Sequence, residues 1–397
     1  MKRLTKRFSA PEEEREHVKD RLGSILFLFL IETAFFGLIL LFLVVEGIIP
    51  VFSVILGTIL LSYLIKRFES VNDFLQSLFN CHKRVAILWG MIFLLALPIL
   101  LHKSPYLIHI LFLAGLYAAL AIGLDFQVGS THLVNFATAA DYGIGAYTAA
   151  LLSVKFGWSF WVVLPLGGVA AALFGFLLGL PTMKTKTYYL SLVTIAVGLV
   201  IYLLLNNFAW TGGPNGVSGI PFPRIGSFSF GSSLLIFGIE LPFQANFYYL
   251  ILILVIIEFV VAQRLYHSKI GLAWNAIRDD EIAAECQGID VTGSKIMAFY
   301  TNAFFDGLAG AVYAFNVSFI SPENFTFMLS VIVVTMVIVG GMGNTAGVIF
   351  GAIIMTLIPE KLQVLQTYRL WVFGLIILLM LLVRPKGLFP QKIRQYT

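Results

Sequence analysis

One apolar stretch decides the fold class of this sequence: Tyr106-Leu-Ile-His-Ile-Leu-Phe-Leu-Ala-Gly-Leu-Tyr-Ala-Ala-Leu-Ala-Ile-Gly-Leu124. It contains no charged residue, and a helix of about 20 apolar residues crosses the roughly 30 Å hydrocarbon core of a bilayer. Eleven further runs lie near 24–45, 48–65, 85–101, 142–154, 161–180, 188–208, 246–263, 296–316, 326–342, 346–359 and 369–383. The sequence therefore predicts an all-α polytopic membrane protein with about 10–12 transmembrane helices, including short or broken segments.

The composition excludes a soluble enzyme. Of the 397 residues, 59% are hydrophobic and only 12% are charged, far from the balance of a soluble domain. The sequence contains no Gly-x-x-x-x-Gly-Lys-Ser/Thr motif, so it predicts no phosphate-binding loop. The two cysteines, Cys81 and Cys286, do not have metal-ligand spacing, and we expect neither a metal site nor a catalytic residue.

The basic residues indicate the orientation of the chain. If the amino terminus is cytoplasmic, only five of the 26 Lys and Arg residues fall on the opposite side: Lys103, Lys155, Arg224, Lys361 and Arg369. Loops on the cytoplasmic side of membrane proteins carry an excess of Lys and Arg. The pattern predicts that both termini are cytoplasmic. It also explains the net charge of +5 by the excess of basic residues on the cytoplasmic side of the membrane lipid, so we do not expect nucleic-acid binding.

The runs divide the chain into three parts. Residues 1–23 form a cytoplasmic amino-terminal segment, and 24–104 form a transmembrane extension in which apolar residues at helical spacing predict an interfacial helix over 68–80. Residues 105–390 form the main membrane unit. Two long connections leave this unit, an external loop at 209–245 and a cytoplasmic loop at 264–295.

The external loop is rich in residues that favour turns. Its densest part comprises Thr211, Gly212, Gly213, Pro214, Asn215 and Gly216. At roughly 37 residues the loop is longer than a connection requires. It is therefore either a docking surface for an external partner or a structural plug over the bundle.

The cytoplasmic loop carries the clearest candidate for contact with a partner. Apolar Trp274, Ile277 and Ala284 alternate with charged residues at helical spacing, and Gly288 is suited to end a helix near Gln287. We expect one short surface helix on which a cytoplasmic partner can push. The candidate residues are Arg278, Asp280, Glu281, Ala283, Ala284 and Gly288.

A polar stretch interrupts the apolar pattern within 125–154 and predicts a broken or re-entrant segment. Hydrogen-bonding groups at membrane depth are tolerated only inside protein or against a water-filled cavity. The candidate translocation pathway comprises Ser130, Thr131, Asn135, Thr138 and Asp141, together with Asn302 and Asp306 from the run 296–316. The alternative is a polar kink that packs against a partner subunit.

The cytoplasmic loop resembles the coupling loop of ATP-binding cassette importers, whose pattern is Glu-Ala-Ala, three residues, then Gly. Ala283, Ala284 and Gly288 match this pattern. Ile282 occupies the Glu position, and Glu281 lies one residue early.

The wider sequence resembles the LivM-type permease of branched-chain amino acid importers, from about Pro105 to Pro390. The matching elements are Gly143-Ile-Gly-Ala-Tyr147, Gly271-Leu-Ala-Trp-Asn-Ala-Ile-Arg278, Phe304-Phe-Asp-Gly-Leu-Ala-Gly-Ala311, Gly340-Gly-Met-Gly343 and Arg384-Pro-Lys-Gly-Leu388. The resemblance implies that 105–390 is a permease core in a prokaryotic inner membrane. It also implies a second, LivH-type permease, two cytoplasmic ATPases that use ATP and Mg, and an external substrate-binding protein, with no cofactor on this chain.

Two departures leave other functions open. Asn135-Phe136-Ala137 is more similar to the partner permease type, and Lys186-Thr-Tyr-Tyr189 replaces a common Arg-Gly-Asp-Tyr loop. The same scaffold is thought to carry urea or short amides in some relatives. A further alternative is an ion-coupled secondary amino acid carrier that uses Glu258, Asp306 or Asp141, although such a carrier does not need a docking helix in 264–295.

Overall fold

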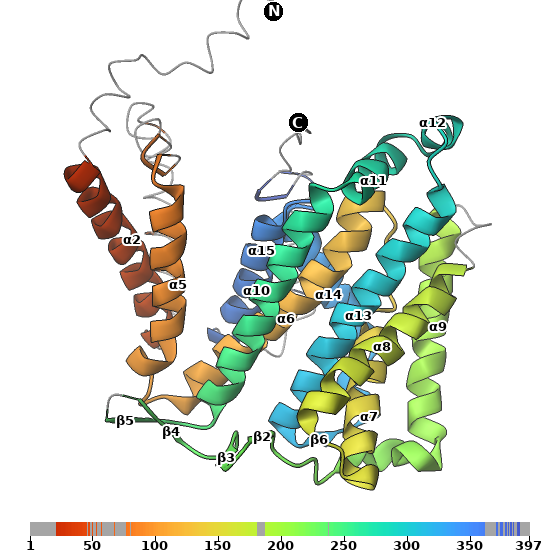
Figure 1. The fold of residues 1–397 in the computed structure, drawn as a ribbon, viewed down its shortest axis with the longest axis horizontal. Coiled ribbons are helices and arrows are strands. Elements are labelled where there is room, and N and C mark those ends of the chain that lie inside the picture. The colour runs from red at the N-terminus through yellow and green to blue at the C-terminus, as the bar shows by residue number, and fades with distance from the viewer. Residues whose placement is uncertain are drawn as a thin grey trace, which may run out of the picture. The chain divides into compact units, whose positions relative to one another are not determined.

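The computed structural model describes residues 21–45, 81–180, 187–236 and 238–361, with scattered positions between 47 and 79 and between 371 and 389 (Figure 1). The chain divides into two compact units. One comprises Met1–Leu101 and Lys361–Gln363, and the other comprises His102–Glu360 and Val364–Thr397. The predicted segment 1–23, the predicted helix 68–80 and the spans near 48–65 and 369–383 lie largely outside the described residues.

The first unit contains two described apolar helices, α2 (Arg21–Val44) and α5 (Lys83–Leu100). Aromatic rings join them: the centroids of Phe36 and Phe93 lie 3.8 Å apart, and those of Phe29 and Trp89 lie 4.3 Å apart. Many of their other large apolar side chains are exposed, such as Leu30 and Leu88. Exposed apolar side chains of this kind are suited to contact with lipid.

The second unit is a bundle of eight described helices. They are α6 (Pro105–Thr131), α7 (Thr138–Phe156), α8 (Phe160–Gly179), α9 (Thr187–Asn207), α10 (Gln244–Tyr266), α13 (Val291–Val317), α14 (Phe327–Gly340) and α15 (Thr345–Lys361). Helix α13 contacts α6, α7, α8 and α10. Because these neighbours shield it, α13 can carry polar residues that would be costly in lipid.

Seven helices of the described chain are long and apolar enough to cross a membrane, two in the first unit and five in the second. Together with the scarcity of strands, this confirms the predicted all-α polytopic fold. The side of the membrane on which the termini lie stays a prediction. Helix α6 runs seven residues past the predicted end at Leu124, because its polar last turns are buried in protein rather than exposed to lipid.

Close contacts between glycines hold the centre of the bundle together. A Cβ added at Gly145 of α7 would lie 2.3 Å from Gly307 Cα of α13, and one added at Gly310 would lie 2.1 Å from Tyr142 O. The two backbones therefore approach more closely than side chains would allow. This crossing brings the first turns of α7, where Asp141 lies, next to the turn of α13 that contains Asp306.

Short irregular elements gather at one end of the bundle, which we call the strand end (Figure 1). They are η3 (Ala209–Thr211), η4 (Gly213–Asn215), β1 (Val217–Ser218), β2 (Arg224–Ile225), β3 (Phe228–Ser229), β4 (Leu234–Ile236), β5 (Ile239–Leu241), β6 (Phe319–Ile320) and η5 (Pro322–Phe325). The strands pair antiparallel as β1 with β6, β2 with β3 and β4 with β5. The turn-forming composition of 209–245 is the reason that no long helix forms there.

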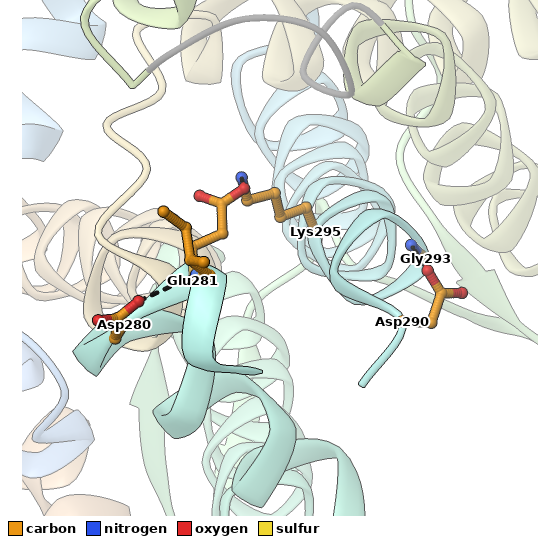
Figure 2. A network of polar contacts seen from close by, with 6 residues as sticks. Asp280, Glu281, Asp290, Gly293 and Lys295 are labelled. Atoms are coloured by element: carbon orange, nitrogen blue, oxygen red, sulfur yellow. Dashed lines mark hydrogen bonds and ion pairs between the residues drawn. The ribbon is translucent and has the colours of Figure 1, made fainter. Parts of the chain in front are cut away.

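The opposite end of the bundle carries two short helices, α11 (Lys269–Asp279) and α12 (Glu281–Cys286) (Figure 1). The expectation of one helix in this loop was wrong. Asp280 interrupts the helix with an extended backbone, φ −158° and ψ 112°, and its Oδ1 accepts hydrogen bonds from Ile282 N and Ala283 N at 3.0 Å each (Figure 2). An aspartate in this position favours the start of a new helix over continuation of the old one. Gly288, with φ +79°, follows α12 as expected.

Replacing Asp280 with alanine should loosen α12 while leaving the membrane helices intact. The substitution removes the acceptor of two amide protons, which typically costs about 1 kcal/mol of helix stability. Hydrogen exchange of the amides of 282–286 should become about fivefold faster, and Asp280→Asn should restore protection because asparagine caps a helix similarly. Asp279→Ala, at an exposed neighbour, is the matched control. Unchanged exchange in Asp280→Ala would show that the cap does not hold α12.

Candidate functional site

Helices α11 and α12 are joined tightly to the bundle. Ser268 Oγ accepts a hydrogen bond from Ile270 N at 3.2 Å and so caps α11. Gly271 allows α11 to turn directly off α10, because a Cβ there would lie 2.4 Å from Tyr266 O. A larger residue at this point would push the two helices apart. The start of α11 is therefore fixed to the end of α10.

Trp274 anchors the middle of α11. Its side chain is fully buried, and its Nε1 donates a hydrogen bond to Ser294 O at 2.9 Å. The indole belongs to an apolar cluster that joins α6, α10 and α13, with buried members Ile122, Phe126, Ala262, Tyr266, Ala298 and Phe305. A displacement of α11 must therefore disturb three membrane helices.

An ion pair ties α12 to α13. Lys295 Nζ lies 2.5 Å from Glu281 Oε1, and the two side chains point toward each other (Figure 2). Lys295 is only 5% exposed, whereas the Glu281 side chain is half exposed. Asp290 caps α13 nearby, since its Oδ1 accepts a hydrogen bond from Gly293 N at 2.9 Å. Sequence reasoning did not identify Lys295, because its partner lies 14 residues away across a loop.

The outer face of α12 is exposed and partly apolar. Ile282 is 74% exposed, and Ala283 is exposed beside it, whereas Ala284 is buried against the protein. Arg278 pairs with Asp279 at 3.4 Å on the preceding helix. The six residues predicted for the loop thus lie along one segment, where Ala284 packs inward while Asp280, Glu281, Ala283 and Gly288 are exposed. The exposed isoleucine is available for contact with another protein.

The residues predicted for the pathway are all enclosed by the bundle. None is more than 5% exposed: Ser130, Thr131, Asn135, Thr138, Asp141, Asn302 and Asp306. Asn135 Nδ2 and both carboxylate oxygens of Asp141 are buried without a hydrogen-bond partner among the described residues. The structure therefore gathers these residues around α6, α7 and α13, in agreement with a broken segment.

Side chains from other helices satisfy the backbone of that break. Phe136 N donates a hydrogen bond to Thr194 Oγ1 of α9 at 3.1 Å, and Ser191 Oγ donates one to Val134 O at 3.2 Å. Within the segment, Asn135 Oδ1 accepts from Ala137 N at 2.8 Å. Non-helical backbone at membrane depth requires such partners in place of water.

A second polar group lies between α6 and α13. Asn302 Oδ1 and both carboxylate oxygens of Asp306 are buried without a hydrogen-bond partner among the described residues. They approach α6 at Gly123, where a Cβ would lie 2.8 Å from Asp306 Oδ1 and 3.1 Å from Asn302 Oδ1. Across the described chain no three His, Cys, Asp or Glu side chains converge at a metal site.

The glycines of the predicted docking loop form a closed turn. A Cβ at Gly212 would lie 2.0 Å from Gly216 O, and one at Gly216 would lie 2.0 Å from Ile320 O. Thr211 Oγ1 donates within the turn, to Leu205 O or Phe208 O at 2.9 and 2.8 Å. Of the six predicted residues, Pro214 and Asn215 are exposed. Two neighbouring aromatic side chains, which sequence reasoning missed, are also exposed: Phe208 and Trp210.

Comparison with known proteins identifies the family. The family model described as branched-chain amino acid transport system, permease component, matches residues 106–383. The high-affinity branched-chain amino acid transport permease proteins LivM of Salmonella typhimurium and Escherichia coli are each 37% identical over 317 residues, which cover 75% of this chain and 75% of each relative. The probable LivH permease of Methanocaldococcus jannaschii is 24% identical over 247 residues, 61% of this chain and 75% of the relative. No solved structure matches the chain. The chain belongs to the family of branched-chain amino acid transport system permease components.

Proposed function

We propose that this chain is the membrane-spanning permease subunit of an ATP-driven importer for branched-chain amino acids, and that it forms the translocation pathway with a second, LivH-type permease. The names of its LivM and LivH relatives support both the substrate class and the second permease. The observation that carries the proposal is the segment α11–α12. It is capped, joined to the bundle through Trp274, and exposes Ile282 outward.

ATP hydrolysis belongs to partner chains in this proposal. The sequence has no Gly-x-x-x-x-Gly-Lys-Ser/Thr loop with which to bind a nucleotide phosphate. We assign ATP and Mg to two cytoplasmic ATPases that dock on α11–α12, and we assign the protein to the inner membrane of a prokaryote. The chain itself binds no cofactor.

The strand end would face outward and receive an external substrate-binding protein. In support, three of the five cations expected on the outer side lie at this end: Lys103 before α6, Lys155 at the end of α7 and Arg224 in β2. Lys155 Nζ lies 4.3 Å from the centre of the exposed Trp210 ring. Exposed aromatic side chains beside fixed turns are suited to contact with a partner protein.

The polar residues around the break are the proposed lining of the pathway. Their burial supports a pathway that is closed in this conformation and opens when the bundle rearranges. Transport by the variants Asn135→Ala and Asp141→Asn distinguishes a lining of the pathway from a polar kink. If the segment is only a kink that packs against the partner permease, folded and assembled variants should keep transport.

Reconstitution of the assembled complex tests the proposed function. The chain is co-purified with the second permease and both ATPases, placed in lipid vesicles, and supplied with ATP and the leucine-loaded binding protein. We expect ATP-dependent leucine uptake and faster ATP hydrolysis when the loaded binding protein is present. Leucine uptake without the ATPases would indicate an ion-coupled carrier instead. Stimulation by urea or a short amide, but not by leucine, would indicate the alternative substrate class.

The variant Ile282→Lys should lose ATPase binding without loss of folding. Because this side chain is 74% exposed, a charge there leaves the bundle intact but removes apolar contact area from the proposed interface. We expect the amount of ATPase that co-purifies to fall about tenfold, which corresponds to roughly 1.4 kcal/mol. Leu235→Lys is the matched control, since Leu235 is 68% exposed at the strand end. Normal ATPase association in Ile282→Lys would contradict the assigned docking face.

A further inference from the structure

Asp125 lies in α6 and is not among the residues predicted for the pathway. Its side chain is fully buried, and its two carboxylate oxygens accept hydrogen bonds from two different parts of the chain. Gly343 N donates to Oδ1 at 2.7 Å, and Tyr266 OH donates to Oδ2 at 2.9 Å or to the Asp125 backbone oxygen at 3.1 Å. A buried carboxylate needs such donors, because it has lost its hydration.

The two donors belong to elements that connect to different parts of the chain. Tyr266 is the last residue of α10, and α11 turns off it directly at Gly271. Gly343 lies in the turn between α14 and α15. Gly129, one turn after Asp125, leaves room for the contact, since a Cβ there would lie 2.2 Å from Asp125 Oδ1 and 2.5 Å from Gly343 N.

Both sides of this junction are held firmly. On the α11 side, Tyr266 packs in the apolar cluster with Trp274, and the ring centres of Phe126 and Tyr266 lie 6.0 Å apart. On the other side, the carboxyl-terminal residues bind the end of α14: Leu388 N donates to Val339 O at 2.9 Å and Phe389 N to Gly340 O at 3.2 Å. Neither donor can therefore move independently of Asp125 without breaking these contacts.

We propose that Asp125 is a positioning residue that transmits displacement of α11 to α6 and to the turn between α14 and α15. Movement of α11 alone would pull the Tyr266 hydroxyl from a buried carboxylate, which is unfavourable in a low-dielectric interior. The three elements therefore move together. Asp125 lies six residues before the end of α6 at Thr131, where the broken segment begins, so the displacement reaches that segment. This inference rests on the proposed function, because a partner ATPase must push α11.

Uptake per ATP hydrolysed tests the role of Asp125. Tyr266→Phe keeps the ring in its cluster but removes the donor, and Asp125→Asn weakens acceptance from both donors. In vesicles containing the whole complex, we expect each variant to transport about tenfold less leucine per ATP, with assembly and basal ATP hydrolysis unchanged. Tyr147→Phe is the matched control: its hydroxyl is buried without a hydrogen-bond partner among the described residues, so coupling should stay at the wild-type value.

Combining the two substitutions distinguishes a shared link from separate damage. The loss in the double variant should be smaller than the sum of the two single losses, since both changes weaken the contact between Tyr266 and Asp125. Additive losses, or a parallel fall in assembly, ATP hydrolysis and uptake, would overturn the inference and leave Asp125 a purely structural residue. If the wild-type complex shows no stimulation by the loaded binding protein, the proposed function fails. If the wild type couples normally and both variants keep its uptake per ATP, only this inference fails.

Discussion

Polar groups that lie inside a membrane bundle must find partners within the protein, and the arrangement of the second unit follows from this constraint. The break between α6 and α7 is stable because side chains of α9 bond its backbone. Ser330 of α14 meets the same need at the start of α7, where Ala139 N donates to its Oγ at 2.9 Å. The backbone of the six-residue break and of the start of α7 therefore binds side chains of α9 and α14, which lie far away in the sequence.

The large features of the fold could be predicted because they follow from local composition. Apolar runs gave the membrane helices, and the turn-forming residues of 209–245 gave an irregular connection. The predicted helix boundaries were wrong where tertiary contacts determine the ends of the helices. Helix α6 continues through Asp125 and Gln127 because protein surrounds these residues, a circumstance that no periodicity reveals. The loop 264–295 forms two helices because the Asp280 side chain competes for the backbone amides that follow it.

The candidate site was less accessible to prediction for the same physical reason. The partners of Asp125 lie 141 and 218 residues away in the sequence, so its role depends on how the bundle closes. The coupling-loop pattern, by contrast, is local, and its glycine falls where α12 ends. Its departure at Ile282 places an isoleucine that is 74% exposed on the outer face of α12.

In the proposed function, the chain receives a push at α11–α12 and carries it into the bundle through the contacts of Trp274 and Asp125. The most direct test measures distances between spin labels at three positions. After Cys81→Ser, the labels are attached to the native Cys286 of α12, to Ala346→Cys of α15 and to Leu235→Cys at the strand end. The three labelled positions and Cys81 are all exposed. On ATP binding to the complex, the distance between 286 and 346 should stay constant while both distances to 235 change together. A change in the distance between 286 and 346, with a constant distance between 346 and 235, would contradict transmission of the displacement from α11 to the turn between α14 and α15.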